Sequence, residues 1–364
     1  MQASKLWYEK LRNFLVRMGY EQSETDQCVF RKVIGDRVYL ITVYVDDLFI
    51  FATEDELERL RVAFTAEFKW ITMEVGRVHS FLGMQLSFRD GQVEIDMTYY
   101  LAKILQEFKD LKEEALPGKK HLFALSPDSF LLTEKKKRFF HTIVAKLLYL
   151  SRRARPDIIT TIGFLCTRVQ APAEEDMAKL EHLMGYLLRT RNKVLVLRPS
   201  QSFRIVAYVD ASFATHNDVK SNSGIVIFVS GVAVFCASRK QKCVCKSPTE
   251  AELVALSDNL GFIELFQEFV AFITNAKVEV PLIFQDNTSV ISMVTTGGGT
   301  TRTKHMRTRM FLVLESLKEK RVTIRYIHTS GMIADGLTKP IDGKDFDYFI
   351  NKVMGCCKKS TGGR

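Results

Sequence analysis

The sequence of 364 residues lacks any run of eighteen or more apolar residues, and its first residues, Met1 to Lys5, lead into an amphipathic pattern without an apolar signal region. These absences argue against a membrane-spanning or secreted protein. The seven cysteines are scattered, which fits neither a disulfide framework nor the paired spacing of a zinc site. A reducing, intracellular location follows, cytoplasmic or nuclear. No internal repeat is visible.

Basic residues outnumber acidic residues, and this excess indicates a negatively charged binding partner. Lys and Arg number 52 against 42 Asp and Glu, which gives a net charge of +10 and a pI near 9.2. A polyanion such as nucleic acid is therefore the first partner to test, and no membrane partner is expected. Charge alone does not separate RNA from DNA.

The first 110 residues alternate helical and extended patterns. Apolar spacing predicts helices over residues 7–18, 54–68 and 98–108, and β-branched runs predict strands at 28–30 and 38–52. Asp46 and Asp47 interrupt the second run, which predicts a hairpin with two carboxylates at its tip. A strand pair is expected around residues 81–95, with Asp90-Gly91 at the turn.

Two boundaries are expected in the rest of the chain, one at an irregular connector and one near Pro199. Residues 111–126 have no clear period, and helices are predicted over 137–151 and 173–190. After Pro199 the pattern predicts three strands within residues 203–237, a long helix over 248–273, and further strands at 280–284 and 322–327. Helices from residue 288 and over 304–318 lie between those strands. The basic tail after residue 355 is predicted to be disordered.

Four acids of the C-terminal region, Asp210, Glu252, Asp286 and Asp335, stand at strand ends or on helices. Acids at strand ends converge where a ligand can reach them, although each alone is also explained as a turn former or helix cap. Glu250 completes a capping box with Ser247, whereas Glu252 lies at the edge of an apolar stripe and needs a partner. Clustered carboxylates repel one another, and two Mg²⁺ ions, or Mn²⁺, would remove the repulsion.

Seven short segments of the C-terminal region form an ordered set: Tyr208 to Ser212, Lys220 to Gly224, Ser238 to Gln241, Ser247 to Glu252, Asp286-Asn287, Arg302 to His305 and Ala334 to Lys339. These motifs resemble, in order, the ribonuclease H domain of copia-type retrotransposon polyproteins. The resemblance implies an α/β (α+β) fold with a mixed five-stranded sheet, and cleavage of the RNA strand of an RNA:DNA hybrid. It also implies that Asp210, Glu252, Asp286 and Asp335 ligate Mg²⁺. Ser212 departs from relatives that carry a second Asp.

Other residues of this region are candidates for the same chemistry. His328, seven residues before Asp335, could protonate the leaving group or help release product; the alternative is a solvated histidine at a strand end, and the copia pattern does not require a histidine here. Basic residues after the three glycines at 297–299 could grip phosphates of the hybrid, or could simply form a solvated helix face. The nucleic-acid-binding candidates are Arg302, Lys304, His305 and Arg309.

The first two-thirds resemble the palm, thumb and connection of the copia-type reverse transcriptase, through Tyr44 to Asp47, Phe81 to Met84 and Arg155 to Ile158 among other segments. Asp46 and Asp47 match two metal-binding acids, but the family carries a further palm Asp on an earlier strand, which this sequence does not contain. The fingers are absent as well. We therefore expect an incomplete metal site and no primer extension by this chain.

The sequence thus predicts a fragment of a copia-type polyprotein. Its parts are a truncated palm and thumb over 1–110, a linker and helical connection over 111–200, a ribonuclease H domain over 201–350, and a basic tail over 351–364. Other polyprotein products are possible partners, and the oligomeric state stays open. The alternatives are an inactive nucleic-acid-binding remnant and an integrase-like strand-transfer enzyme. Glu252 on the helix after three strands, and the lack of a His/Cys zinc segment, argue against the integrase.

Overall fold

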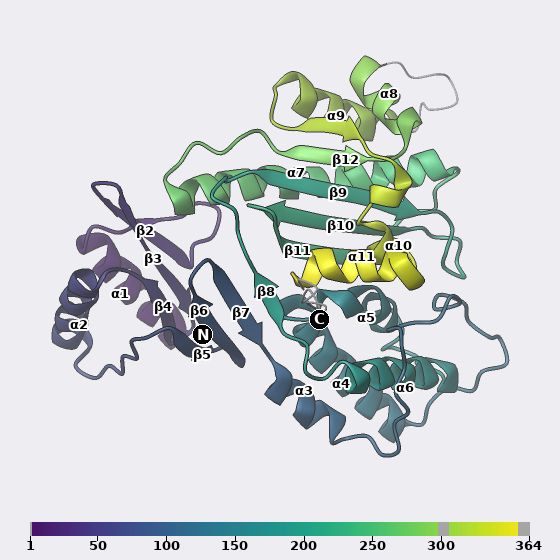
Figure 1. Cartoon of the computed structure of the whole chain (residues 1–364), viewed down its shortest axis with the longest axis horizontal. Helices are drawn as coiled ribbons and strands as arrows, with labels where there is room; N and C mark the ends of the chain where they lie inside the picture. Colours follow the sequence, from purple (N-terminus) through teal and green to yellow (C-terminus); the bar gives the residue numbers. More distant parts are fainter. Residues whose placement is uncertain (1, 298–305, 356–364) are drawn as a thin grey trace, which may run out of the picture.

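The computed structural model of the chain describes residues 2–297 and 306–355. These residues form three β-sheets and the helices that cover them (Figure 1). Two four-stranded sheets come from the N-terminal part, and the second of them gains its last strand from residues 195–197. A five-stranded sheet comes from the C-terminal part and lies above a group of helices. The predicted α/β (α+β) class is confirmed.

The first sheet is antiparallel, with strand order β1-β2-β3-β4. Every second residue of β3 is buried, so Tyr39, Ile41 and Val43 pack into one core with the flanking helices. Tyr44 pairs with Asp47, which confirms the predicted hairpin. The elements are α1 (Gln2–Arg17), β1 (Glu21–Gln22), β2 (Val29–Ile34), β3 (Arg37–Tyr44), β4 (Asp47–Phe51) and α2 (Glu54–Phe68).

The second sheet joins segments that are about a hundred residues apart. Its strands are β5 (Val78–Phe81), β6 (Met84–Arg89), β7 (Gln92–Asp96) and β8 (Leu195–Leu197), in that order. The predicted turn at Asp90-Gly91 joins β6 to β7, but Phe81 belongs to β5 instead of to the predicted pair. The sequence did not predict β8, because three residues are too few to show a period.

Helices fill the middle of the chain: α3 (Thr98–Leu105), α4 (Glu134–Arg153), the 3₁₀ turn η1 (Pro156–Ile158), α5 (Ile159–Cys166) and α6 (Glu174–Arg189). The short helix α5 was not predicted, because nearly all its residues are buried and it has no polar face to mark a period. Arg155 is buried beside η1, where its Nη2 lies 2.8 Å from Asp157 Oδ2. Tyr186 donates to the same oxygen at 2.6 Å, so the buried pair is fully partnered.

The C-terminal sheet has the order β11-β10-β9-β12-β13. Strand β9 pairs antiparallel with β10, and β10 with β11, whereas β12 runs parallel to both β9 and β13. The mixed five-stranded sheet implied by the resemblance is therefore confirmed. The strands are β9 (Ile205–Ser212), β10 (Asn222–Val229), β11 (Val232–Lys240), β12 (Leu282–Gln285) and β13 (Thr323–Tyr326).

Each face of this sheet has its own apolar core. Ile205, Ala207 and Val209 of β9 pack with α7 (Pro248–Thr274), α8 (Thr288–Thr296) and α9 (Arg307–Lys318). The alternate residues Val206 and Tyr208 face a second core, which holds α4 to α6, α10 (Asp335–Thr338) and α11 (Gly343–Met354). Figure 1 shows α10 and α11 between the sheet and α5. Both cores meet at β9, which carries Asp210.

The core on the α11 side runs from Met84 to Met354 and so crosses the boundaries predicted at residues 111 and 201. Helix α11 likewise extends past residue 350, and residues 356–364 of the predicted tail lie outside the described residues. In both described ranges, every helix is too short or too polar to cross a membrane.

Candidate metal centre

Asp210 lies on β9 opposite Gly224 of β10, near the carboxyl end of the strand. The side chain is buried, and its Oδ2 accepts a hydrogen bond of 2.7 Å from the Thr338 hydroxyl. A bulkier residue at position 224 would not fit, because a Cβ there would meet the Ala334 carbonyl oxygen at 2.8 Å. The close approach at Gly224 therefore lets α10 reach Asp210.

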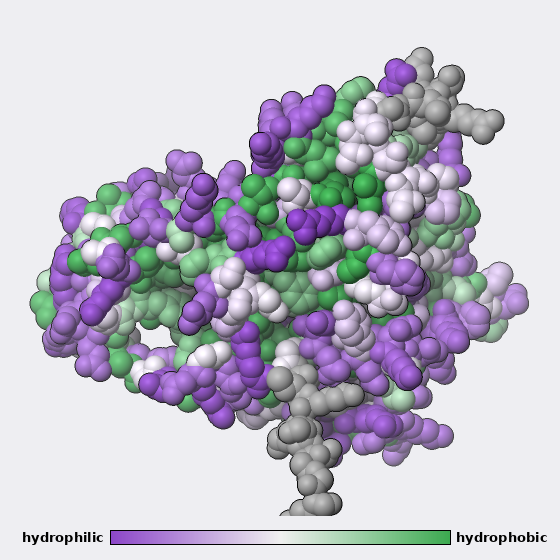
Figure 2. All heavy atoms as spheres, turned by 45° about the horizontal axis from the view of Figure 1, so that its top comes forward, coloured by the Kyte–Doolittle hydropathy of each residue, from purple (hydrophilic) through white to green (hydrophobic). Residues whose placement is uncertain are grey.

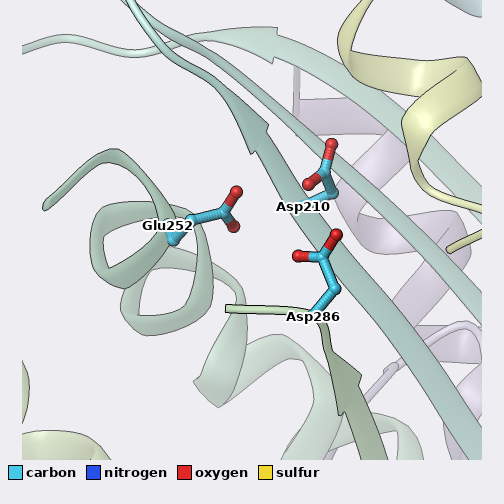
Figure 3. A group of neighbouring side chains, drawn as sticks. All are labelled: Asp210, Glu252 and Asp286. Carbon is cyan, nitrogen blue, oxygen red and sulfur yellow. The ribbon is translucent and has the colours of Figure 1, made fainter. Parts of the chain in front are cut away.

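Glu252 is the fifth residue of α7, and the way this helix begins fixes its position. Ser247 is the N-cap and its hydroxyl accepts from the Glu250 amide at 3.2 Å, with Pro248 at the first helical position. The Glu250 carboxylate accepts a hydrogen bond from the Lys246 amide at 2.6 Å. Its predicted capping role is confirmed, although the amide that it caps is that of Lys246 and not that of Ser247. Glu252 is buried and points toward the end of β9 (Figure 3).

Asp286 follows the last residue of β12 and is partly buried. Its Oδ2 accepts from the Thr329 hydroxyl at 2.9 Å. One carboxylate oxygen from each of Asp210, Glu252 and Asp286 lies within 4.8 Å of the others. The three side chains come from β9, α7 and the end of β12 and point toward one another (Figure 3). Three of the four predicted carboxylates therefore converge.

Asp335, the fourth predicted acid, stands beside this group and outside its 4.8 Å limit. It opens α10, and its Oδ1 pairs with Lys339 Nζ at 3.0 Å. The Thr338 hydroxyl that contacts Asp210 also lies 3.1 Å from the Asp335 carbonyl oxygen. Asp335 thus joins the site from the side of Asp210, and Lys339 brings a positive charge to it.

The charge balance of the cluster favours a cation. Burial and the neighbouring Asp210 charge raise the pKa of Glu252 well above its ordinary value. The same two causes raise the pKa of Asp335 to about 6, against the opposing effect of Lys339. Burial lowers the pKa of Lys339, but Asp335 and the other acids outweigh it and the net change is upward. Hard carboxylate oxygens at this spacing suit Mg²⁺ or Mn²⁺.

His328 is exposed on the loop between β13 and α10 and caps the 3₁₀ turn η3 (Thr329–Gly331). Its Nδ1 lies 2.9 Å from the Ser330 hydroxyl. The next residue, Thr329, is the one that donates to Asp286. His328 therefore lies on the loop that borders the carboxylates.

Of the nucleic-acid-binding candidates, Arg302, Lys304 and His305 lie outside the described residues. Arg309 lies on α9, where its Nη1 donates to the Ser257 hydroxyl at 2.6 Å and pairs with Asp258. The guanidinium is therefore engaged with α7, and about a third of its side chain stays exposed.

Asp46 and Asp47 are exposed at the tip of the β3–β4 hairpin. They border a cavity of about 1090 Å³ between the first two sheets, which is also lined by Phe49, Phe88 and Trp70. Figure 2 shows the surface hollowed in this N-terminal part. Among the residues that the structure describes, these two acids belong to no group of three or more His, Cys, Asp or Glu with ligand atoms within 4.8 Å of one another.

Three polar residues at the carboxylates were not assigned a role from the sequence. Thr338 and Lys339 belong to a motif that carries the resemblance, so that motif could have indicated them. Gln285 contacts Glu252 but precedes Asp286 on a strand whose sequence is otherwise apolar. The sequence around Gln285 therefore gave no signal of a role, and its complete burial in the structure identifies it.

Comparisons with known proteins agree with these observations. The reverse transcriptase (RNA-dependent DNA polymerase) family matches residues 1–116. The Retrovirus-related Pol polyprotein from transposon RE1 of Arabidopsis thaliana is 24% identical over 361 residues, which cover 97% of this chain and 24% of that protein. A transposon Ty5-1 protein of Saccharomyces cerevisiae is 29% identical over 269 residues, which cover 71% of this chain and 85% of that protein. The chain thus spans about a quarter of the length of the Arabidopsis relative.

Solved structures with similar parts include a ribonuclease H1 isolated from compost, at a TM-score of 0.31 and 15% identity over 37% of this chain and 92% of that chain. The prototype foamy virus protease-reverse transcriptase gives a TM-score of 0.29 and 12% identity over 84% of this chain and 37% of that chain. The fold is assigned from the strand order and pairing described above. Residues 1–116 thus match the reverse transcriptase family, and nearly the whole chain is similar to part of a retrotransposon Pol polyprotein.

Proposed function

We propose that the C-terminal part of this chain hydrolyses the RNA strand of RNA:DNA hybrids. The observation that carries the proposal is the convergence of Asp210, Glu252 and Asp286 from three separate elements to within 4.8 Å. Buried acids this close are costly unless protonated or neutralised, so their arrangement favours a site for divalent cations. The family relationship supports a substrate that is a nucleic acid.

The residues present fit two Mg²⁺ ions, or Mn²⁺. Asp210, Glu252 and Asp286 would hold them, and Asp335 would contribute from the side of α10. When bound, such ions activate water and stabilise the leaving oxygen of a phosphodiester. The chain's own residues hold the carboxylates in place: Thr338 fixes Asp210, and Thr329 fixes Asp286.

The remaining roles are assigned by position. His328 borders the site on an exposed loop and is our candidate for protonating the leaving 3′-oxygen. Arg309, together with Arg302, Lys304 and His305, is proposed to contact phosphates of the hybrid. The net charge of +10 supports nucleic-acid binding.

The scattered cysteines favour an intracellular location, cytoplasmic or nuclear. Residues 201–350 remain our proposed ribonuclease H domain, after a palm and thumb part over 1–110 and a connection over 111–200.

Substitution of Asp286 by asparagine tests the proposal. Asp286→Asn removes one negative ligand with little change of shape, so Mg²⁺-dependent cleavage of a labelled hybrid should fall by at least about a hundredfold. Hybrid binding should stay the same or tighten, because a repulsive charge is lost. Asp128→Asn, at an exposed turn, is the matched control and should cleave normally. Unchanged cleavage by Asp286→Asn would rule the proposal out.

The same assay distinguishes the alternatives. A hybrid that binds to the wild-type chain and is never cut in Mg²⁺ or Mn²⁺ would favour the inactive nucleic-acid-binding remnant. Joining of DNA ends would favour the integrase-like enzyme.

We also propose that this chain does not extend a primer. Nucleotidyl transfer by two metal ions needs more carboxylate than Asp46 and Asp47 provide, and no further acid joins them among the described residues. A primer-extension assay with the full chain should therefore give no incorporation. Incorporation that disappears in Asp46→Asn would contradict this expectation.

A further inference from the structure

Gln285 is the last residue of β12 and is completely buried at the carboxylate cluster. A buried amide costs free energy unless its donors and acceptors are satisfied. Leu282 and Ile283 of the same strand are buried apolar residues, so a leucine or valine would suit position 285 for packing alone. A glutamine here therefore calls for an explanation through its hydrogen bonds.

All four hydrogen-bonding positions of the Gln285 amide are used. Its Oε1 accepts from the backbone amides of Asp286, at 2.8 Å, and Asn287, at 3.0 Å. Because these partners can only donate, the oxygen must face them and the nitrogen must face the other side. The Nε2 then donates to Glu252 Oε2 at 3.3 Å and to the Val209 carbonyl at 3.4 Å.

These four bonds reach Glu252, the backbone at Asp286 and the residue before Asp210. One pair holds the backbone at Asp286, one bond holds the carboxylate of Glu252, and one holds the residue before Asp210. We propose that Gln285 is a positioning residue that sets the spacing of Asp210, Glu252 and Asp286 for divalent cations. This inference rests on the proposed function. It assigns a role to a residue that contacts the proposed metal-binding residues and not the substrate.

Positioning residues of this kind have measurable effects on metal affinity. Groups that hydrogen-bond to metal ligands typically alter affinity or activity by about 10-fold to 100-fold when removed. Gln285→Met keeps an unbranched side chain of similar volume and removes both donor bonds and both acceptor bonds. It should weaken binding of Mn²⁺ by about tenfold or more, and lower kcat while leaving KM for the hybrid nearly unchanged.

Gln267→Met is the matched control. Gln267 lies on α7, fifteen residues beyond Glu252, and its Nε2 contacts the carbonyls of Val278 at 3.5 Å and Glu279 at 3.4 Å. This control loses a glutamine amide from the helix that carries Glu252 but far from the carboxylates, because a helix rises about 1.5 Å per residue. It should change neither Mn²⁺ affinity nor kcat.

The experiment titrates the full chain with Mn²⁺ by calorimetry and measures hybrid cleavage in parallel. Weaker Mn²⁺ binding in Gln285→Met, with Gln267→Met unchanged, supports the inference. Wild-type affinity and kcat in Gln285→Met would overturn it. If Gln285→Met does not fold, Gln285→Leu removes the same four hydrogen bonds, and wild-type Mn²⁺ affinity and kcat in that variant would equally overturn the inference.

The metal titration separates the two proposals. If the wild-type chain binds Mn²⁺ but cleaves no hybrid, the proposed function fails while the Mn²⁺ affinities still decide the role of Gln285. If the wild-type chain cleaves and Gln285→Met binds Mn²⁺ normally, the function stands and the positioning role is wrong. If the wild-type chain does not bind Mn²⁺, the inference is overturned with the metal site.

Discussion

His216 shows how a single titratable residue connects the parts of this molecule. It is buried between the rings of Phe123, whose centroid lies 4.7 Å away, and Phe164, at 6.3 Å. Its Nε2 lies 3.3 Å from Asn222 Oδ1, so this nitrogen carries the proton of the neutral ring. Burial lowers the pKa of His216 below its ordinary value, and the Asn222 bond only partly offsets that effect.

This lowered pKa predicts acid sensitivity. In the unfolded chain His216 takes up a proton as the pH falls below about 6.5, whereas in the folded chain its lowered pKa delays protonation to a lower pH. The contribution of this group to stability should therefore be fully present above about pH 6.5 and be lost as the pH falls toward the folded-state pKa. Denaturant unfolding between pH 5 and 8 measures the slope. His216→Phe should reduce it, and the exposed control His121→Phe should not.

At the scale of an element, the first turn of α7 decides where Glu252 lies. Ser247 caps the helix, Pro248 starts it, and Glu250 closes the turn by accepting from the Lys246 amide. Gln241 holds the same turn from outside, because its Nε2 donates to the Ala251 carbonyl at 2.9 Å. Of the three converging acids, Glu252 is the one that fraying at this end would displace, since it lies within two turns of the start of α7.

Ser247→Ala should therefore affect both stability and metal binding. Loss of an N-cap costs about 1 kcal/mol, and the loosened turn should weaken Mn²⁺ binding by a few-fold. Thr133→Ala is the matched control, since Thr133 caps α4 by accepting from the Lys136 amide at 3.5 Å. It should cost similar unfolding free energy and leave Mn²⁺ affinity unchanged. Equal Mn²⁺ affinities in the two variants would contradict the link between the cap and Glu252.

At the scale of the whole molecule, the middle helices and the C-terminal sheet share one core. Thr160 of α5 donates to the Gly336 carbonyl in α10 at 2.6 Å, directly beside Asp335. The Asn222 amide supports the same helix by donating to the carbonyls of Leu337 and Thr338. Farther away, Arg31 of β2 donates to the Phe272 carbonyl near the end of α7 at 2.7 Å. The middle helices thus brace α10 beside the carboxylates, and the first sheet contacts the far end of α7.

Thr160→Val tests this bracing. The substitution keeps the shape of the side chain and leaves the buried Gly336 carbonyl without this donor, which should cost about 1–3 kcal/mol of unfolding free energy. Cleavage should also fall, because α10 carries Asp335 and Thr338. Thr142→Val, whose hydroxyl donates to Arg138 on the exposed surface of α4, should change little. Thermal unfolding and hybrid cleavage measure the two effects, and a Thr160→Val chain as stable as Thr142→Val would show that the contact is dispensable.

Local patterns in the sequence were enough to identify most elements and the acids of the site. The helix over 54–68 and the hairpin at Asp46 and Asp47 depend on neighbouring residues alone, so periodicity predicts them. The capping box at Ser247 has the same local origin. The resemblance indicated Asp210, Glu252 and Asp286, and these three converge.

Only the tertiary structure decided how distant segments meet. Pairing of β8 with β7, the buried helix α5 and the place of Asp335 outside the 4.8 Å group all depend on contacts between residues far apart in sequence. The engagement of Arg309 by Asp258 and the four bonds of Gln285 have the same cause. A one-dimensional pattern records which side of an element is apolar. It does not record which other element packs there, because that choice depends on the shape and charge of the whole folded chain.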